Sequence, residues 1–298
     1  MYIDNTGHRW FKGNLHMHTT ESDGALTPAE AAALYTENGY DFIARTDHWK
    51  VGPADEFDTL LCLTGCEYHI GTRAVDGIFH IVGVGMEKDP EMRRDTPDNP
   101  LTAQEIVDTI HRFGGLAVIA HPAWSLNTPE MLLAIHRDTP FDMTEIYNST
   151  SDMPRNCRPY SGLITDMLAC AGVYLPLGAA DDSHLYAPWD RCRSYIWVQA
   201  EDCTREAILS ALHAGRFYAS QGPRLDVRLE EGKILVDCDP VEEIVYFTDA
   251  VWTPHRSQVG EGLTHGEYVP NAIDTFVRVE VKDKDGKYGW SQYVQVKK

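Results

Sequence analysis

Residues 13–24 read GNLHMHTTESDG, a short apolar strand pattern that carries two histidines and runs into a polar turn. Side chains alternate between the two faces of a β-strand, so His16 and His18 share one face while the intervening apolar residues face the other. Two imidazoles at a strand end can bind one metal ion, and Asp23 in the turn could add a carboxylate. Taken alone, the pattern fits two ordinary strand histidines equally well.

The segments around this stretch alternate between helical and strand patterns. Thr27, Pro28 and Glu30 form the capping-box start of a helix. Residues 116–120 (LAVIA) form a continuous apolar run, which is typical of a strand buried on both faces of a parallel sheet. We therefore expect an α/β fold with a parallel sheet over residues 1–222.

Histidine, aspartate and glutamate residues follow the expected strands one after another. In a barrel of parallel strands, the carboxyl ends of the strands meet at one end of the barrel, and the catalytic residues lie there. Each residue alone has an ordinary explanation as a turn former or half-buried polar residue. Burying so many titratable groups without partners would be costly, and metal ions are suitable partners. Nine ligands predict a cluster of two or three divalent ions. The candidate ligands are His16, His18, Asp23, His48, Glu67, His80, His121, Asp182 and His184.

The composition is that of an ordinary globular protein, with 43% hydrophobic and 24% charged residues among 298. The formal net charge of -19 repels nucleic-acid phosphate at long range, so we expect duplex nucleic acid to be an unlikely partner. A membrane-spanning apolar run and a secretory signal are not expected. The seven cysteines lack the spacing of a zinc site or a disulfide framework, which favours a cytoplasmic protein with reduced thiols.

The pattern changes near residue 223, beyond which helical periodicity disappears. Residues 276–281 alternate strictly between apolar and polar side chains, residues 284–287 form a turn, and residues 288–296 read as the partner strand. We expect two domains, a barrel at residues 1–222 and a small antiparallel, Ig-like β-sandwich at residues 223–298.

In order and together, the motifs resemble the full motif set of the PHP (polymerase and histidinol phosphatase) superfamily, over roughly residues 10–222. Residues 215–223, with the strands that follow, resemble its CehA/McbA-like branch. The resemblance implies a distorted (β/α)7 barrel of the TIM-like kind. The motifs are His16-x-His18, Ser22-Asp23-Gly24, Thr46-Asp47-His48, Glu67, His80-Ile81-Val82-Gly83-x-Gly85, His121-Pro122 and Asp182-x-His184.

The resemblance also implies how the ligands divide among three ions. Many relatives have a histidine at the position of Asp23, and a carboxylate there favours manganese or iron beside zinc. The implied sets are His16, His18, Glu67 and Asp182 for the first ion; Asp23, His48 and His184 for the second; and the bridging Glu67 with His80 and His121 for the third.

The chemistry that we expect is hydrolysis of a small-molecule phosphate mono- or diester by a hydroxide bridging two ions, without a protein nucleophile. Asp47 and Glu145 could orient a ligand imidazole. Arg155 and Arg158, in the loop after the strand at 143–148, could bind phosphate, although they also fit as ordinary surface arginines. Two alternatives stay open, namely hydrolysis of a carbamate or aryl ester on the same site, and a metal-binding module without catalysis.

Overall fold

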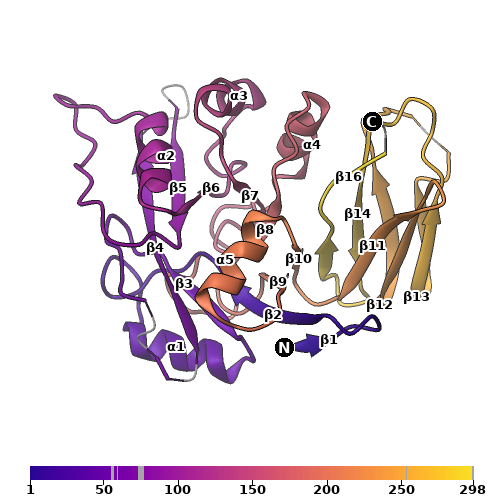
Figure 1. Ribbon diagram of the computed structural model, residues 1–298, viewed down its shortest axis with the longest axis horizontal. Helices are drawn as coiled ribbons and strands as arrows, with labels where there is room; N and C mark the ends of the chain where they lie inside the picture. Colours follow the sequence, from indigo (N-terminus) through magenta and orange to yellow (C-terminus); the bar gives the residue numbers. More distant parts are fainter. Residues whose placement is uncertain (55–56, 59, 73–76, 253, 297–298) are drawn as a thin grey trace.

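The computed structural model describes residues 1–54, 57–58, 60–72, 77–252 and 254–296, which form a mixed α/β fold (Figure 1). None of the described helices has the length and apolar character needed to span a membrane. The helices are α1 (Pro28–Glu37), α2 (Ala103–Arg112), α3 (Pro129–Asp138), α4 (Gly162–Cys170) and α5 (Arg205–His213). The strands are β1 (Tyr2–Ile3), β2 (Arg9–Asn14), β3 (Phe42–Arg45), β4 (Leu61–Ile70), β5 (Phe79–Val84), β6 (Leu116–Ile119), β7 (Met143–Asn148), β8 (Leu177–Ala180), β9 (Tyr195–Gln199), β10 (Phe217–Ser220), β11 (Leu225–Glu230), β12 (Lys233–Phe247), β13 (Ser257–Tyr268), β14 (Phe276–Lys282), β15 (Tyr288–Trp290) and β16 (Val294–Gln295).

The strands β2 to β8 are neighbours in sequence order, and the segment after β8 returns to the segment after β2. The backbone N–H of Asp182 donates to the carbonyl of His16 at 2.9 Å, and the N–H of His18 donates to the carbonyl of Ser183 at 2.9 Å. These bonds bring the polar segments that follow the first and last of these strands side by side.

The expected parallel sheet is only partly present. The neighbours β2, β3 and β4 are parallel, as are β6, β7 and β8, but β5 is antiparallel to both β4 and β6. Eight residues separate the end of β4 from the start of β5, which is too short for the crossover that a parallel pair needs. Strand β9 is also antiparallel, to β2 and to β10.

The local helix signals are confirmed. A complete capping box starts α1, where the Thr27 hydroxyl accepts from the backbone of Glu30 and the Glu30 carboxylate accepts from the backbone of Thr27. Helix α2 begins in the same way after Thr102, and its buried residues include Ile106 and Ile110, which belong to the core beneath β5 and β6.

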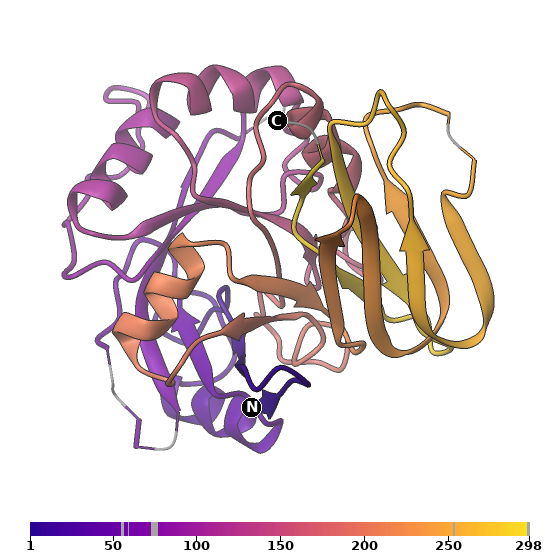
Figure 2. The same ribbon diagram turned by 45° about the vertical axis from the view of Figure 1, so that its right-hand side comes forward.

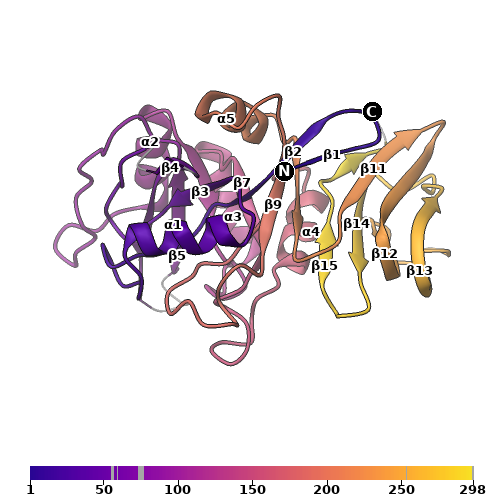
Figure 3. The same cartoon turned by 90° about the horizontal axis from the view of Figure 1, so that it is seen from below.

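The antiparallel strands of the C-terminal part are confirmed, but the sandwich is not. Strand β14 pairs with β15 across the predicted turn, and β15 pairs in turn with β10, so the C-terminal strands continue the sheet of the rest of the molecule. The order is β11-β12-β14-β15-β10, with β13 on the other edge of β12. These strands, coloured from orange to yellow, stand beside the N-terminal part and not over it in all three ribbon views (Figures 1, 2 and 3).

A close approach between β2 and β3 gives a testable prediction about the fold. A Cβ added to Gly13 would lie 2.0 Å from Cζ of Phe42, whose ring is fully buried. We expect Gly13→Ala to lower the free energy of unfolding by about 1–3 kcal/mol through overpacking, as measured by urea denaturation. The control is Gly178→Ala in β8, where the added Cβ would make contacts of 3.4 Å and longer. Equal losses in both variants would contradict the prediction.

Candidate metal centre

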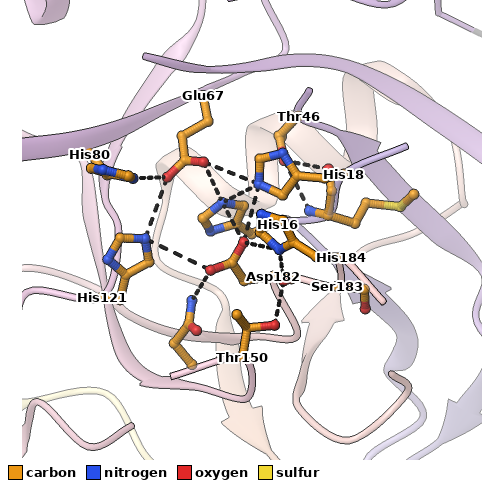
Figure 4. Close-up of polar contacts among 12 residues, drawn as sticks. His16, His18, Thr46, Glu67, His80, His121, Thr150, Asp182, Ser183 and His184 are labelled. Atoms are coloured by element: carbon orange, nitrogen blue, oxygen red, sulfur yellow. Dashed lines mark hydrogen bonds and ion pairs between the residues drawn. The ribbon is translucent and has the colours of Figure 1, made fainter. Parts of the chain in front are cut away.

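The nine candidate ligands lie together, although the chain supplies them from segments more than 160 residues apart. Figure 4 shows the candidate ligands other than Asp23 and His48. His16 and His18 follow β2, His48 follows β3, and Asp182 with His184 follow β8, while the remaining ligands lie on or next to β4, β5, β6 and the turn after β2. Within each group, the ligand atoms lie within 4.8 Å of one another. The groups are His16, His18, Glu67 and Asp182; His18, Asp23, His48 and His184; and Glu67, His80 and His121.

The first group is fully buried and has the spacing of a coordination shell. The Nε2 atoms of His16 and His18 are 3.3 Å apart, and each lies 3.1–3.2 Å from Glu67 Oε2 and from Asp182 Oδ1. Four ligands at 2.0–2.1 Å from a tetrahedral ion are separated by about 3.3 Å. The four side chains therefore fit a bound divalent ion without rearrangement.

Asp182 supplies an independent indication that the group is built for a cation. Its Oδ1 is buried and, among the described residues, accepts no hydrogen bond of good geometry, although Nε2 of His16 and Nε2 of His18 lie 3.1–3.2 Å away. A buried carboxylate oxygen without an aligned donor is costly. Its backbone is also held in the left-handed region at φ 54°, as is that of His121 at φ 28°. Such strain costs of the order of 1–3 kcal/mol and concentrates at functional sites.

Glu67 connects the groups through its two oxygens. Oε2 lies 3.2 Å from Nδ1 of His48 in addition to its contacts in the first group, whereas Oε1 lies 2.8 Å from Nδ1 of His80 and 3.4 Å from Nε2 of His121. One carboxylate thus faces five imidazoles and belongs to two of the three groups.

The second group is looser and more open than the first. Asp23, whose side chain is 55% exposed, lies 3.5 Å from Nδ1 of His18, 3.6 Å from Nε2 of His184 and 3.9 Å from Nε2 of His48. His18 stands between the two groups because its Nε2 faces the first and its Nδ1 faces Asp23.

The electrostatics of the buried groups favour a positive charge at this position. Burial alone would lower the pKa of His18, but the carboxylates of Asp182 and Glu67 raise it to about 9. Burial would raise the pKa of Glu67, but the imidazoles of His16 and His80 hold it well below its ordinary value. His48, where burial dominates, has its pKa lowered to about 4. The carboxylates are therefore ionised in the interior, where a divalent cation would offset their charge.

Of the two carboxylates expected to orient an imidazole, Glu145 contacts one directly. Its Oε1 lies 2.7 Å from Nδ1 of His16, and its Oε2 accepts from the backbone N–H of His121 and from the amide of Asn148, both at 2.8 Å. A carboxylate at Nδ1 fixes the His16 tautomer whose Nε2 lone pair faces the first group.

Asp47 has a different role. It accepts hydrogen bonds from the backbone N–H of Thr19 at 2.7 Å, from the Thr19 hydroxyl at 2.8 Å and from the Ser22 hydroxyl at 2.8 Å. Asp47 therefore holds the turn that carries Asp23. It also reaches the ligands through Ser22, whose Oγ lies 3.4 Å from Nδ1 of His18, and through its own carbonyl, which accepts from the backbone N–H of Glu67 at 3.3 Å.

Sequence reasoning missed two residues that support the ligands. Asn148 donates from its amide to Asp182 Oδ2 at 3.3 Å as well as to Glu145, and it ends β7 in a polar run that signals a strand end. His69 lies behind the site, with its Nδ1 at 3.2 Å from Nδ1 of His48 and its ring stacked on His80.

A cavity of about 180 Å³ opens onto the site. Besides ligands of all three groups, it is lined by Trp124, Arg155 and Asn156. Of the two arginines expected to bind substrate, both are exposed, but only Arg155 is part of the lining of this cavity. A larger cavity of about 680 Å³, between the N-terminal segment and the C-terminal strands, contains none of the candidate ligands. We place the function at the smaller cavity because the ionisable groups converge there.

No protein-family model and no curated protein matches the sequence. Solved structures do match. A two-domain protein containing a predicted PHP-like metal-dependent phosphoesterase, from Bacteroides vulgatus, superimposes with a TM-score of 0.58 at 16% identity, over 99% of this chain and 98% of that chain. A lesion-specific endonuclease from Pyrococcus furiosus superimposes with a TM-score of 0.50 at 19% identity, over 69% of this chain and 56% of that chain. At these identities, the similarity shows a shared fold.

The second match corrects one expectation. Duplex nucleic acid was expected to be an unlikely partner because of the net charge of -19, but a protein of similar fold is an endonuclease. Net charge is a sum over the whole surface, whereas exposed charges more than about 10 Å apart are largely screened at physiological salt. Cations bound at a site also reverse the local field. The overall charge therefore does not exclude a nucleic-acid partner.

Proposed function

We propose that this protein is a metal-dependent hydrolase of phosphate esters, with a PHP-type, TIM-like barrel at residues 1–222 and membership of the CehA/McbA-like branch. The observation that carries the proposal is the convergence of nine ligand side chains into three groups. Glu67 belongs to the first and third groups, and His18 belongs to the first and second. The fold similarity to the Bacteroides vulgatus protein supports the same reaction class.

The three groups would hold two or three divalent ions, with manganese, iron and zinc as the candidates. Such ions, when bound, lower the pKa of a coordinated water and offset charge on a phosphoryl group. The chain's own contribution is positional: Glu145 fixes the ring of His16, Asn148 holds Asp182, and Asp47 holds the turn that presents Asp23. No serine or cysteine nucleophile enters the proposal.

Arg155 is proposed to bind the phosphate group of the substrate. It is the one arginine or lysine among the residues that line the described cavity, and a guanidinium matches the geometry of phosphate oxygens. The cavity of about 180 Å³ is smaller than the sites of roughly 300–1,000 Å³ that enclose drug-sized ligands. The size favours a small phosphate ester, or the phosphate end of a larger one.

A variant pair tests this role. We expect Arg155→Ala to raise KM for a phosphate ester about tenfold or more with a smaller change in kcat, because a charge-assisted contact to the bound phosphate is lost. The matched control is Arg158→Ala, in the same loop but outside the cavity, which should leave both constants unchanged. Steady-state kinetics after reconstitution with Mn²⁺ provide the measurement. Equal effects of the two substitutions would contradict the assignment.

The reaction class itself is tested by a panel of phosphate monoesters and diesters, assayed with added Mn²⁺, Fe²⁺ or Zn²⁺. We expect turnover of at least one ester that stops when the ions are chelated. Turnover of carbamates or aryl esters alone would favour the alternative that the same site hydrolyses non-phosphate bonds. Bound metal without any turnover would favour a metal-binding module.

A second candidate is cleavage of a phosphodiester in nucleic acid. The fold similarity to the lesion-specific endonuclease supports it, and its test is the incubation of end-labelled single-stranded and duplex oligonucleotides, with and without a base lesion, in the presence of Mn²⁺. Metal-dependent cleavage at a defined position would favour this candidate over a small-molecule substrate.

A further inference from the structure

The loop at residues 149–160 brings Arg155 and Asn156 to the cavity, and both of its ends close on β7. The backbone N–H of Asn148 donates to the carbonyl of Pro159 at 3.0 Å, and Tyr160 forms an isolated bridge with Tyr147. Helix α4 follows directly. The loop is therefore a closed excursion whose base includes Tyr147 and Tyr160. Its first residues are also held by the segment after β8, because the N–H groups of Ser149 and Thr150 donate to the carbonyls of Ala180 and Asp181, both at 3.0 Å.

The C-terminal strands β11 to β16, called the C-terminal sheet below, hold the first of the two tyrosines by stacking. The ring of Tyr147 stacks on the indole of Trp290 in β15, with centroids 5.4 Å apart, and Trp290 is fully buried and stacked in turn on Tyr288 at 5.6 Å. With its ring fixed in this way, Tyr147 donates from its hydroxyl to Asp152 of the loop at 2.8 Å.

The second tyrosine is held by polar contacts. The Tyr160 hydroxyl donates to Oε2 of Glu280 in β14 at 2.7 Å and accepts from Nη2 of Arg278 at 3.3 Å. Arg278 is fully buried, and it also donates to both carboxylate oxygens of Asp166 in α4, at 2.9 and 2.8 Å. A bidentate pair of this kind fixes the Arg278 guanidinium. The guanidinium in turn fixes the two partners of the Tyr160 hydroxyl, which are its own Nη2 as the donor and Glu280 as the acceptor.

We propose that the C-terminal sheet positions the substrate loop, with Tyr147 and Tyr160 as the positioning residues that hold Arg155 at the cavity. The inference rests on the proposed phosphate-binding role of Arg155. A further ion pair of the loop, between Arg193 and Asp152 at 3.5 Å, is partly exposed, and pairs of this kind contribute little. The sheet thus has a role in binding although it supplies no ligand to the metal centre.

The test removes single hydroxyls and leaves the rings in place, in Tyr160→Phe and, as a second variant, Tyr147→Phe. Hydrogen exchange of residues 149–160 should become faster in both variants, while exchange in β4 and β8 stays unchanged. The affinity for inorganic phosphate should fall about five- to tenfold, the usual size of the loss of one hydrogen bond, at unchanged metal content. In the Arg155→Ala background, the same hydroxyl deletions should have no further effect on phosphate affinity.

The control is Tyr246→Phe, which removes a buried hydroxyl of the C-terminal sheet that has no hydrogen-bond partner among the described residues. It should leave loop exchange and phosphate affinity unchanged. Wild-type exchange of residues 149–160 in both loop variants would overturn the positioning role, whatever the enzyme hydrolyses. Faster loop exchange together with additive effects in the Arg155→Ala background would also overturn it, because the hydroxyls would then act without Arg155. Since exchange and phosphate binding do not require turnover, a failure of the proposed reaction is recognised separately, from the ester panel.

Discussion

Replacing Glu67 with glutamine should lower kcat/KM for the substrate about a thousandfold or more and remove bound metal. Glu67 faces five imidazoles and belongs to two of the three ligand groups. Glutamine keeps the shape but loses the charge that a divalent ion requires. Metal ions contribute several kcal/mol of transition-state stabilisation, and each 1.36 kcal/mol corresponds to about a factor of ten in rate.

The measurements for this variant are steady-state kinetics and elemental analysis of the same preparation. The control is Glu130→Gln, an exposed carboxylate in the first turn of α3, which should leave rate and metal content unchanged. A Glu67→Gln protein that keeps the wild-type metal content and rate would show that this carboxylate does not hold the ions.

Glu145→Gln should weaken metal binding or activity about 10- to 100-fold, although Glu145 is not itself a proposed ligand. Its carboxylate contacts Nδ1 of His16 at 2.7 Å and anchors the backbone of His121 at 2.8 Å, so two ligands lose their support together. Partners of metal-bound histidines have effects of this size when they are removed.

The test of this variant is a metal titration followed by kinetics at saturating metal. We expect a weaker metal affinity, with much of the activity recovered at high metal concentration, because the ligands themselves remain. An exposed carboxylate of α5 provides the control, as Glu206→Gln. An unchanged metal affinity in Glu145→Gln would contradict the orienting role.

Several elements of the fold follow from local signals. The capping boxes that begin at Thr27 and Thr102 predict α1 and α2 because the bonds they make lie within four residues of chain. The pattern of β5 carries no information on its direction; its antiparallel course follows from the eight-residue connection after β4, which is too short for a parallel crossover. The strand pattern of β12 is interrupted between residues 236 and 244, where polar residues lie at irregularities in its pairing with β13, so the sequence alone does not show one continuous strand.

The site was predictable where its residues sit at strand ends. The position of His16, His18 and Asp182 after expected strands can be read from sequence. The two histidines lie beyond the end of β2, however, and the backbone bonds that join their segment to residues 182–183 are seen only in the structure. Arg155 and Arg158 could not be separated in this way. Only two residues separate them, both side chains are exposed, and the conformation of the loop alone decides that Arg155 lines the cavity while Arg158 does not. Asn148 ends an expected strand, but that position alone does not show that its amide supports two carboxylates.

The most direct test of the central claim is a count of bound metal. Elemental analysis of the protein reconstituted with Mn²⁺, Fe²⁺ or Zn²⁺ should give two or three ions per chain, and Asp182→Asn should reduce that number because its buried Oδ1 faces the first group. A reconstituted wild-type protein that binds no ion would contradict the account.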